Sequence, residues 1–295
     1  MGLTWKGYLL ALRRIFVNTF QNRGFGVAKA AAYSALLSFF PVLTSAATIL
    51  VQSRAESVSR TISEFLFEVV PPGTEDLVRY QFAVKGQRPV FVLIAAGVFA
   101  VWAASGVVGS LLQGFQAAYR IERGRPILHG IAVSMMLVLL SAAPLLAACA
   151  LILFGGYIDR IVMGALAVDP ILTPVTLSWH LLTRAARYAV AFTASVSVTM
   201  LLYYFGPYRR QRWSGVWRGA VLATIFWLLA TAGFGWYVRN IANYNVLYRS
   251  VATSVTLLVW MYLMSIIALL GCEFNAEVER LSLAAAQGVE VSKRS

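Results

Sequence analysis

The chain alternates long apolar runs with shorter polar segments. Crossing a hydrocarbon core of about 30 Å takes about 20 residues of α-helix, and six of the apolar runs reach that length. These predicted spans cover about residues 30–51, 89–118, 127–158, 183–205, 219–238 and 251–272. In lipid, a helix satisfies its own backbone polar groups. The pattern therefore predicts an all-α integral membrane protein, a bundle of six transmembrane helices.

Two further helical segments flank the first span. Residues 3–20 place apolar side chains at helical spacing and predict an N-terminal interfacial helix. Residues 52–88 form the longest polar segment, contain an apolar stripe and predict a helical extracytoplasmic cap. We expect a single membrane domain over residues 1–280 and a cytoplasmic tail over residues 281–295.

Proline interrupts two of the predicted spans. Pro41 lies in the first span and Pro144 in the third. A proline inside a helix frees the backbone carbonyl four residues earlier. In the first span, the hydroxyl of Ser38 or Ser45 is expected to help satisfy that carbonyl.

Composition and charge agree with a membrane protein. Hydrophobic residues make up 59% of the chain and charged residues 13%, about half of the roughly 25% charged residues in soluble domains. The net charge is +13, which in a membrane protein reflects basic loops beside anionic headgroups. We expect membrane lipids with anionic headgroups as partners, and no nucleic acid. A homo-oligomer or an envelope protein partner stays open.

The basic residues also predict the orientation of the spans. Fifteen Lys and Arg residues fall on the side of the termini, many in short loops, and ten fall on the other side in longer loops. Short basic loops face the cytoplasm. Both termini are therefore expected in the cytoplasm.

Four sequence blocks carry a family resemblance. They are residues 32–41, the turn 119–126, the loop from Pro207 to Gly219, and residues 244–273. Together they resemble the YihY/BrkB family of bacterial inner-membrane proteins, some of which are named ribonuclease BN. The motif positions are Tyr33, Ser38, Pro41, Pro207, Gly219, Tyr244, Tyr248, Trp260, Gly271 and Glu273.

The resemblance covers about residues 5–280 and implies a multi-pass protein of the bacterial inner (plasma) membrane. This chain departs from the family pattern at two positions. Arg249 stands where the family usually has glycine, and Cys272 where it usually has alanine. The glycine-to-arginine change argues against a role that needs a tight turn at that point.

Residues able to make or break covalent bonds are scarce. Metal-assisted RNA cleavage needs clustered carboxylates or histidines. The chain's two histidines, His129 and His180, fall on opposite predicted sides of the membrane, and the sequence holds no HExxH motif or glycine-rich phosphate loop. We expect no catalytic residue, no metal site and no cofactor, and we expect the protein not to be an enzyme.

Two basic turns and one carboxylate are the candidate site. Arginine binds phosphate oxygens in pairs through its planar fork, so the two turns could converge and hold lipid phosphates. Their arginines are Arg120, Arg123, Arg125, Arg209, Arg210 and Arg212. The simpler interpretation is positive-inside topology with nonspecific lipid contact. Glu273, at the edge of the last span, is a functional candidate, or else an interfacial residue facing cytoplasmic water and paired with an arginine of a neighbouring turn.

These features favour a protein that handles or translocates anionic lipids or lipid-linked envelope precursors. One alternative is a non-catalytic envelope scaffold that acts through partners on its cap. A second alternative is the membrane-bound ribonuclease implied by the older family name.

Overall fold

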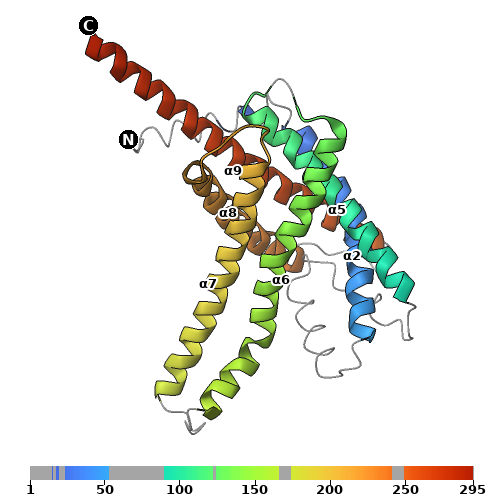
Figure 1. The fold of residues 1–295 in the computed structure, drawn as a ribbon. Coiled ribbons are helices and arrows are strands. Elements are labelled where there is room, and N and C mark those ends of the chain that lie inside the picture. The colour runs from blue at the N-terminus through green and yellow to red at the C-terminus, as the bar shows by residue number, and fades with distance from the viewer. Residues whose placement is uncertain are drawn as a thin grey trace.

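The computed structural model describes residues 15, 18–19, 24–52, 90–121, 124–165, 174–240 and 249–294. Within these residues it holds six long helices and no strand (Figure 1). The helices are α2 (Gly24–Gln52), α5 (Val90–Ala118), α6 (Ile127–Ala165), α7 (Pro174–Phe205), α8 (Trp213–Asn240) and α9 (Arg249–Arg294).

Each of the six helices contains a stretch long and apolar enough to cross a membrane. The predicted all-α fold with six spans is therefore confirmed. The predicted interfacial helix over residues 3–20 and the predicted cap over residues 52–88 lie almost entirely outside the described residues, so both stay predictions.

Several helices run further than the predicted spans. α7 begins at Pro174, where the prediction began at 183, and α6 continues to Ala165 beyond the predicted end at 158. α9 has 46 residues and passes the predicted end at 272 without a break. The prediction placed span ends where charged residues begin, but glutamate, alanine, leucine and arginine are good helix formers in water as well.

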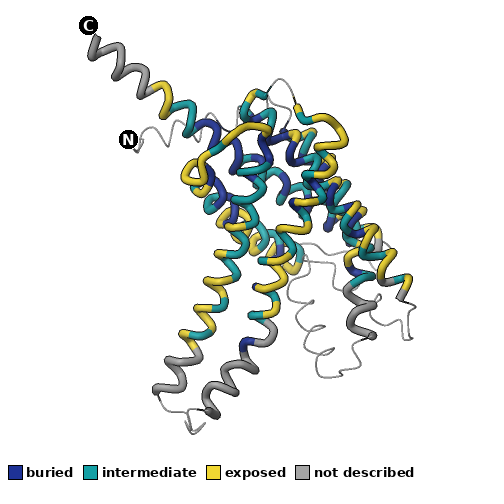
Figure 2. The backbone as a smooth tube through the Cα atoms, viewed as in Figure 1, coloured by how far each residue is buried: buried dark blue, intermediate teal, exposed yellow. Residues whose placement is uncertain are grey.

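The helices form a ring in the order of the chain. α2 packs on α5, α5 on α6, α6 on α7, α7 on α8 and α8 on α9, and α9 returns to α2. α6 and α7 run side by side and project as a long pair away from the rest (Figure 1). Few of their described side chains are buried (Figure 2), and these apolar faces suit contact with lipid.

The buried core lies at one end of the bundle, and all six helices contribute residues to it (Figure 2). Tyr203 of α7 is 1% exposed, and its hydroxyl donates to the Ala268 carbonyl of α9 at 2.7 Å. Its ring meets Phe115 of α5 edge to face, with centroids 5.3 Å apart. A buried hydroxyl with a hydrogen-bond partner adds little cost to this core.

α8 and α9 cross at two glycines. A Cβ atom on Gly219 would overlap the carbonyl oxygen of Gly271, and a Cβ on Gly271 would overlap the Tyr203 hydroxyl. Small residues allow this close approach of helix backbones. The Asn275 side chain reinforces the crossing because its Oδ1 accepts from Gly219 N at 2.8 Å and its Nδ2 donates to the Val216 carbonyl at 2.9 Å.

α2 continues through Pro41, but the expected role of the two serines is wrong. The Ser38 hydroxyl donates to the Ala35 carbonyl and the Ser45 hydroxyl to the Pro41 carbonyl, each at 2.9 Å. A hydroxyl has one hydrogen to donate. Neither serine is therefore available for the Leu37 carbonyl that Pro41 frees.

We predict that Gly219→Ala destabilises the protein, because the added methyl group forces α8 and α9 apart. The expected loss is about 1–3 kcal/mol, measured as a lower unfolding temperature of the purified protein in detergent. Gly233→Ala, in the same helix but with open space around its Cβ position, is the matched control and should be at least as stable as the original chain. Equal unfolding temperatures of the two variants would contradict the close crossing.

Candidate functional site

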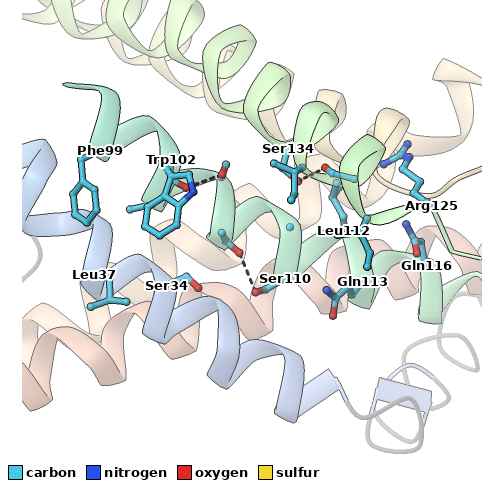
Figure 3. Close-up of a pocket in the computed structure, with 17 residues that line it drawn as sticks. Ser34, Leu37, Phe99, Trp102, Ser110, Leu112, Gln113, Gln116, Arg125 and Ser134 are labelled. Atoms are coloured by element: carbon cyan, nitrogen blue, oxygen red, sulfur yellow. Dashed lines mark hydrogen bonds between the residues drawn. The ribbon is translucent and has the colours of Figure 1, made fainter. Parts of the chain in front are cut away.

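A cavity of about 530 Å³ lies between α2, α5 and α6 (Figure 3). Its small residues leave the space between the helices, and they come from all three of them. They are Ser34 of α2, Ala103, Ser105, Gly106, Gly109 and Ser110 of α5, and Gly130 and Ser134 of α6. We call this cavity the interhelical groove.

The hydroxyls along the interhelical groove are largely used within their own helices. Ser105 donates to the Trp102 carbonyl at 2.6 Å, Ser110 to Gly106 at 3.0 Å and Ser134 to Gly130 at 2.9 Å. These serine hydroxyls are therefore not available as hydrogen-bond donors to a ligand in the groove. The groove offers mainly apolar contact along this stretch.

The two ends of the interhelical groove differ in chemistry. Leu37, Phe99 and Trp102 line one end, and both aromatic side chains are about half exposed. Gln113, Gln116 and Arg125 line the other end (Figure 3). An apolar slot that ends in amides and a guanidinium matches an amphipathic ligand.

Arg125 connects the turn after α5 to the end of α7. Its Nη1 donates to the Gly206 carbonyl at 3.2 Å and its Nη2 donates to the Phe205 carbonyl. Its guanidinium also lies 5.4 Å from the ring centre of Tyr208. Burial lowers the pKa of Arg125 from its ordinary value, but an arginine side chain stays protonated in proteins. Arg125 therefore caps the C-terminal carbonyls of α7 with a positive charge.

Arg125 also lines a second cavity of about 530 Å³, which we call the loop cavity. The other lining residues come from the end of α7 and the loop to α8. They are Tyr204, Phe205, Pro207, Tyr208, Arg209, Arg210 and Gln211. Arg125 is thus a shared wall between the two cavities.

Two buried side-chain donors beside the loop cavity have no hydrogen-bond acceptor among the described residues. They are Nε of Arg125 and Nε2 of Gln211. The Gln211 amide lies beside the Tyr119 hydroxyl, whose pKa is raised by burial, so that hydroxyl stays protonated. A buried donor left without an acceptor costs about 1–3 kcal/mol.

Arg209 is held by two neighbours outside its own loop. Its guanidinium lies 4.5 Å from the ring centre of Tyr119, and its Nη2 pairs with the Glu279 carboxylate of α9. Both members of the ion pair are more than a third exposed. Solvent screens such a pair, so a competing anion could displace the carboxylate.

Arg120 ends α5 in an unusual backbone conformation. Its φ is 54°, the one positive φ of a non-glycine residue among those the structure describes. Its N–H bonds the Ala117 carbonyl at 2.9 Å and the next N–H, of Ile121, bonds the Gln116 carbonyl at 3.0 Å. This is a Schellman cap, in which glycine is normally preferred.

The structure brings half of the six predicted arginines to one cavity. Arg125, Arg209 and Arg210 line the loop cavity. Arg120 and Arg212 are exposed and do not line it. Arg123 lies outside the described residues.

The interpretation of Glu273 as an interfacial residue facing water is wrong. Glu273 is 2% exposed, and Arg280 of the same helix lies 3.6 Å from its carboxylate. Arg280 also pairs with the buried Glu277 at 3.1 Å and donates to the Ala118 carbonyl at the end of α5. The continuation of α9 past the membrane-length segment buries this face against α5.

Glu273, Glu277 and Arg280 form what we call the α9 cluster. Glu277 and Arg280 were not among the predicted site residues, although the spacing of the three residues in the sequence indicates such a cluster. Glu273, Glu277 and Arg280 recur at spacings of four and three, which places them on one helix face. Asn18 reaches the same cluster, with its Nδ2 3.4 Å from Glu277 Oε2. The cluster joins the segment before α2, the end of α5 and α9 at one end of the bundle.

The family-motif positions are dispersed over the fold. Pro207, Gly219 and Gly271 are buried at the end of the bundle that holds the core. Ser38 is buried and Tyr33 is 61% exposed on α2, while Pro41 and Trp260 are half-buried. Tyr244 and Tyr248 lie outside the described residues.

No group of three or more His, Cys, Asp or Glu side chains able to hold a metal ion occurs in the part of the chain that the structure describes.

The two cavities and the helix ring define a helical multi-span membrane protein with a groove and a cationic loop cavity. No solved structure matches this chain.

Residues 15–294 match the family described as Virulence factor BrkB, and the chain belongs to that family. The resemblance found in the sequence is thereby confirmed. A ribonuclease-like protein, YfkH of Bacillus subtilis, is 26% identical over 268 residues, covering 90% of this chain and 94% of YfkH. A UPF0761 membrane protein of Pseudoalteromonas atlantica is 28% identical over 280 residues, covering 90% of this chain and 85% of the relative.

A UPF0761 membrane protein of Alkalilimnicola ehrlichii is longer. It is 26% identical over 260 residues, which make up 86% of this chain and 54% of that relative. This chain therefore spans about half the length of that relative.

We predict that Arg120→Gly stabilises the fold, because glycine adopts the left-handed conformation without the steric cost that Arg120 bears. The expected gain is about 1 kcal/mol, or about 2 °C in the unfolding temperature. Arg210→Gly, at a residue without a positive φ, is the matched control and should not stabilise. A gain from Arg210→Gly equal to that from Arg120→Gly would refute the cap assignment.

Proposed function

We propose that this protein handles anionic lipids or lipid-linked envelope precursors, with the hydrocarbon part of the lipid in the interhelical groove. The observation that carries the proposal is the groove itself, an apolar slot between spans that ends at Arg125. A cavity of about 530 Å³ falls within the usual range of small-molecule sites, about 300–1,000 Å³.

Selectivity in this proposal comes from the polar end of the groove. A lipid chain gains little on leaving other lipid chains for an apolar groove, because both surroundings lack water. The amides of Gln113 and Gln116 and the guanidinium of Arg125 can instead distinguish headgroups by hydrogen bonding and charge. Anionic headgroups are the favoured class.

Movement of a lipid across the membrane is the second part of the proposal. A headgroup entering the hydrocarbon region loses its hydration, which is costly without compensating polar groups. Gln113 and Gln116 extend the polar end of the groove into α5 by about two helical turns from Arg125. Such a polar lining lowers the cost of moving a headgroup into the groove.

We further propose the bacterial inner membrane as the location, with both termini in the cytoplasm. The support is the shared position of the basic turns and the α9 cluster at one end of the bundle, together with the positive-inside rule. The turn after α5 and the loop after α7 contact each other there, through Arg125 with Gly206 and through Arg209 with Tyr119.

The proposed activity makes and breaks no covalent bond. The name of YfkH, a ribonuclease-like protein, applies to that relative, and none of the described residues that line either cavity is an acid or a histidine. The alternative is an envelope scaffold that acts through partners on the predicted cap, and variants of the groove and of the cap distinguish it from lipid handling.

We predict that filling the interhelical groove impairs lipid handling. Gly130→Leu adds a bulky side chain at a residue that lines the groove, and nothing lies within 4 Å of the Cβ position there. Binding or transbilayer movement of phosphatidylglycerol, measured with purified protein in liposomes, should fall about tenfold, equivalent to about 1.4 kcal/mol.

Gly233→Leu in α8 is the matched control, since its Cβ position is also open and it lies outside the groove. It should leave lipid handling unchanged. The proposal fails if the folded original protein neither binds nor moves an anionic lipid. If Glu64→Gln and Glu68→Gln in the predicted cap abolish cellular function while Gly130→Leu does not, the result supports the scaffold alternative over lipid handling.

A further inference from the structure

The loop cavity collects hydrogen-bond donors and positive charge at one place. Arg125, Arg209 and Arg210 line it, and none of the lining residues that the structure describes is acidic. The surroundings are partly dry, since Nε of Arg125 and Nε2 of Gln211 are buried. Charge-assisted hydrogen bonds are strongest in such surroundings.

Arg125 presents an unused donor to this cavity. Its two terminal nitrogens donate to the carbonyls of Phe205 and Gly206, which fixes the orientation of the guanidinium. Its Nε has no acceptor among the described residues. A guanidinium that the protein fixes through its two terminal nitrogens, and whose Nε–H is unused, is prepared to bind an external oxygen atom.

Gln211 supplies a second donor two residues before α8 begins at Trp213. Its Nε2 is buried and has no hydrogen-bond acceptor among the described residues. The positive end of the α8 dipole adds to the field there, because the first turn of α8 carries no acidic residue. Both residues line the loop cavity, and an oxyanion is a suitable acceptor for donors of this kind.

We propose that the loop cavity binds a terminal phosphate group, the doubly charged oxyanion of a phosphomonoester, and that Glu279 competes with this phosphate for Arg209. Among the described residues, the three arginines and the Glu279 carboxylate leave two positive charges around the cavity. A phosphomonoester carries about −1.5 to −2 at neutral pH, so it matches this charge better than a singly charged phosphodiester.

Glu279 gives the site an internal competitor. Arg209 is paired with Glu279 of α9 while its face rests on Tyr119. Binding of phosphate by Arg209 requires the carboxylate to give up its hydrogen bond. Loss of the Glu279 charge should therefore strengthen phosphate binding, an outcome that a merely structural ion pair would not produce.

This inference deepens the proposed function by naming the headgroup, because Arg125 also closes the interhelical groove. The ligand could be free phosphate or the headgroup of a lipid with a terminal phosphate, and both share the same oxyanion chemistry. The experiment therefore uses probes of both kinds.

The test measures binding of inorganic phosphate and methyl phosphate to the purified full chain in detergent, by calorimetry, with dimethyl phosphate as the singly charged probe. We expect inorganic phosphate and methyl phosphate to bind at least fivefold more tightly than dimethyl phosphate. Arg210→Gln should weaken binding at least fivefold, and Glu279→Gln should strengthen it at least twofold. Arg239→Gln, a charge-matched change at the other end of α8, should have no effect.

Two further variants probe the buried donors. Gln211→Met keeps the approximate volume and removes the donor, so it should weaken phosphate binding. Arg125→Lys removes the fork that caps α7, so its unfolding temperature is measured alongside. If Arg125→Lys does not fold, Gln211→Met and Arg210→Gln still decide the outcome.

Nanodiscs distinguish the two sources of the phosphate. Phosphatidic acid that binds more tightly than phosphatidylglycerol, with the Arg210→Gln and Glu279→Gln effects preserved, indicates a lipid headgroup. Binding of soluble phosphate without preference for phosphatidic acid indicates free phosphate. The inference is overturned if neither probe binds, or if Arg210→Gln and Arg239→Gln act alike.

The two proposals can fail separately. If no phosphate probe binds but Gly130→Leu still reduces lipid handling, the terminal-phosphate site is wrong and the groove stands. If phosphate binds with the expected variant effects while Gly130→Leu leaves lipid handling unchanged, the groove proposal is wrong and the phosphate site stands.

Discussion

The arrangement of both cavities depends on the hydrogen bonds from Arg125 to the last carbonyls of α7. The final four carbonyls of a helix have no partner within it, and here the guanidinium from the turn after α5 donates to the carbonyls of Phe205, the last residue of α7, and of Gly206, the residue that follows. This contact fixes the α5–α6 turn against the α7–α8 loop. It also sets the wall that separates the interhelical groove from the loop cavity. A lysine could supply the charge but not the planar fork.

Close packing of small residues holds the rest of the bundle. Helices in lipid gain little from hiding apolar surface, so contact between backbones and buried polar groups must stabilise the ring. The Gly219–Gly271 crossing with its Asn275 hydrogen bonds is such a contact. The Tyr203 hydroxyl extends it to α7 through its bond to Ala268. These contacts gather at one end, while α6 and α7 diverge from the other helices toward the opposite end (Figure 1).

Run length predicted the six spans because membrane thickness fixes the number of apolar residues. The helix ends were harder, since a helix such as α9 continues in water beyond Cys272. The sequence indicated that arginines in two turns could converge, and the structure brings Arg125 and Arg210 together. It could not show the partners of these side chains. The Glu279–Arg209 pair and the burial of Glu273 depend on how α9 packs beside α5 and the loop before α8.

α9 is long enough that a small tilt at its crossing with α8 moves its far end by several ångströms. From the crossing at Gly271 to Arg294, the helix continues for about 35 Å at 1.5 Å per residue and projects beyond the other helices (Figure 1). A tilt of about 5° at the crossing would displace the far end by about 3 Å. Glu279 lies on this part of α9, eight residues beyond the crossing. Small rotations of α9 would therefore change the Glu279–Arg209 distance and the position of the far end of the helix together, and would link the proposed phosphate binding to a movement outside the bundle.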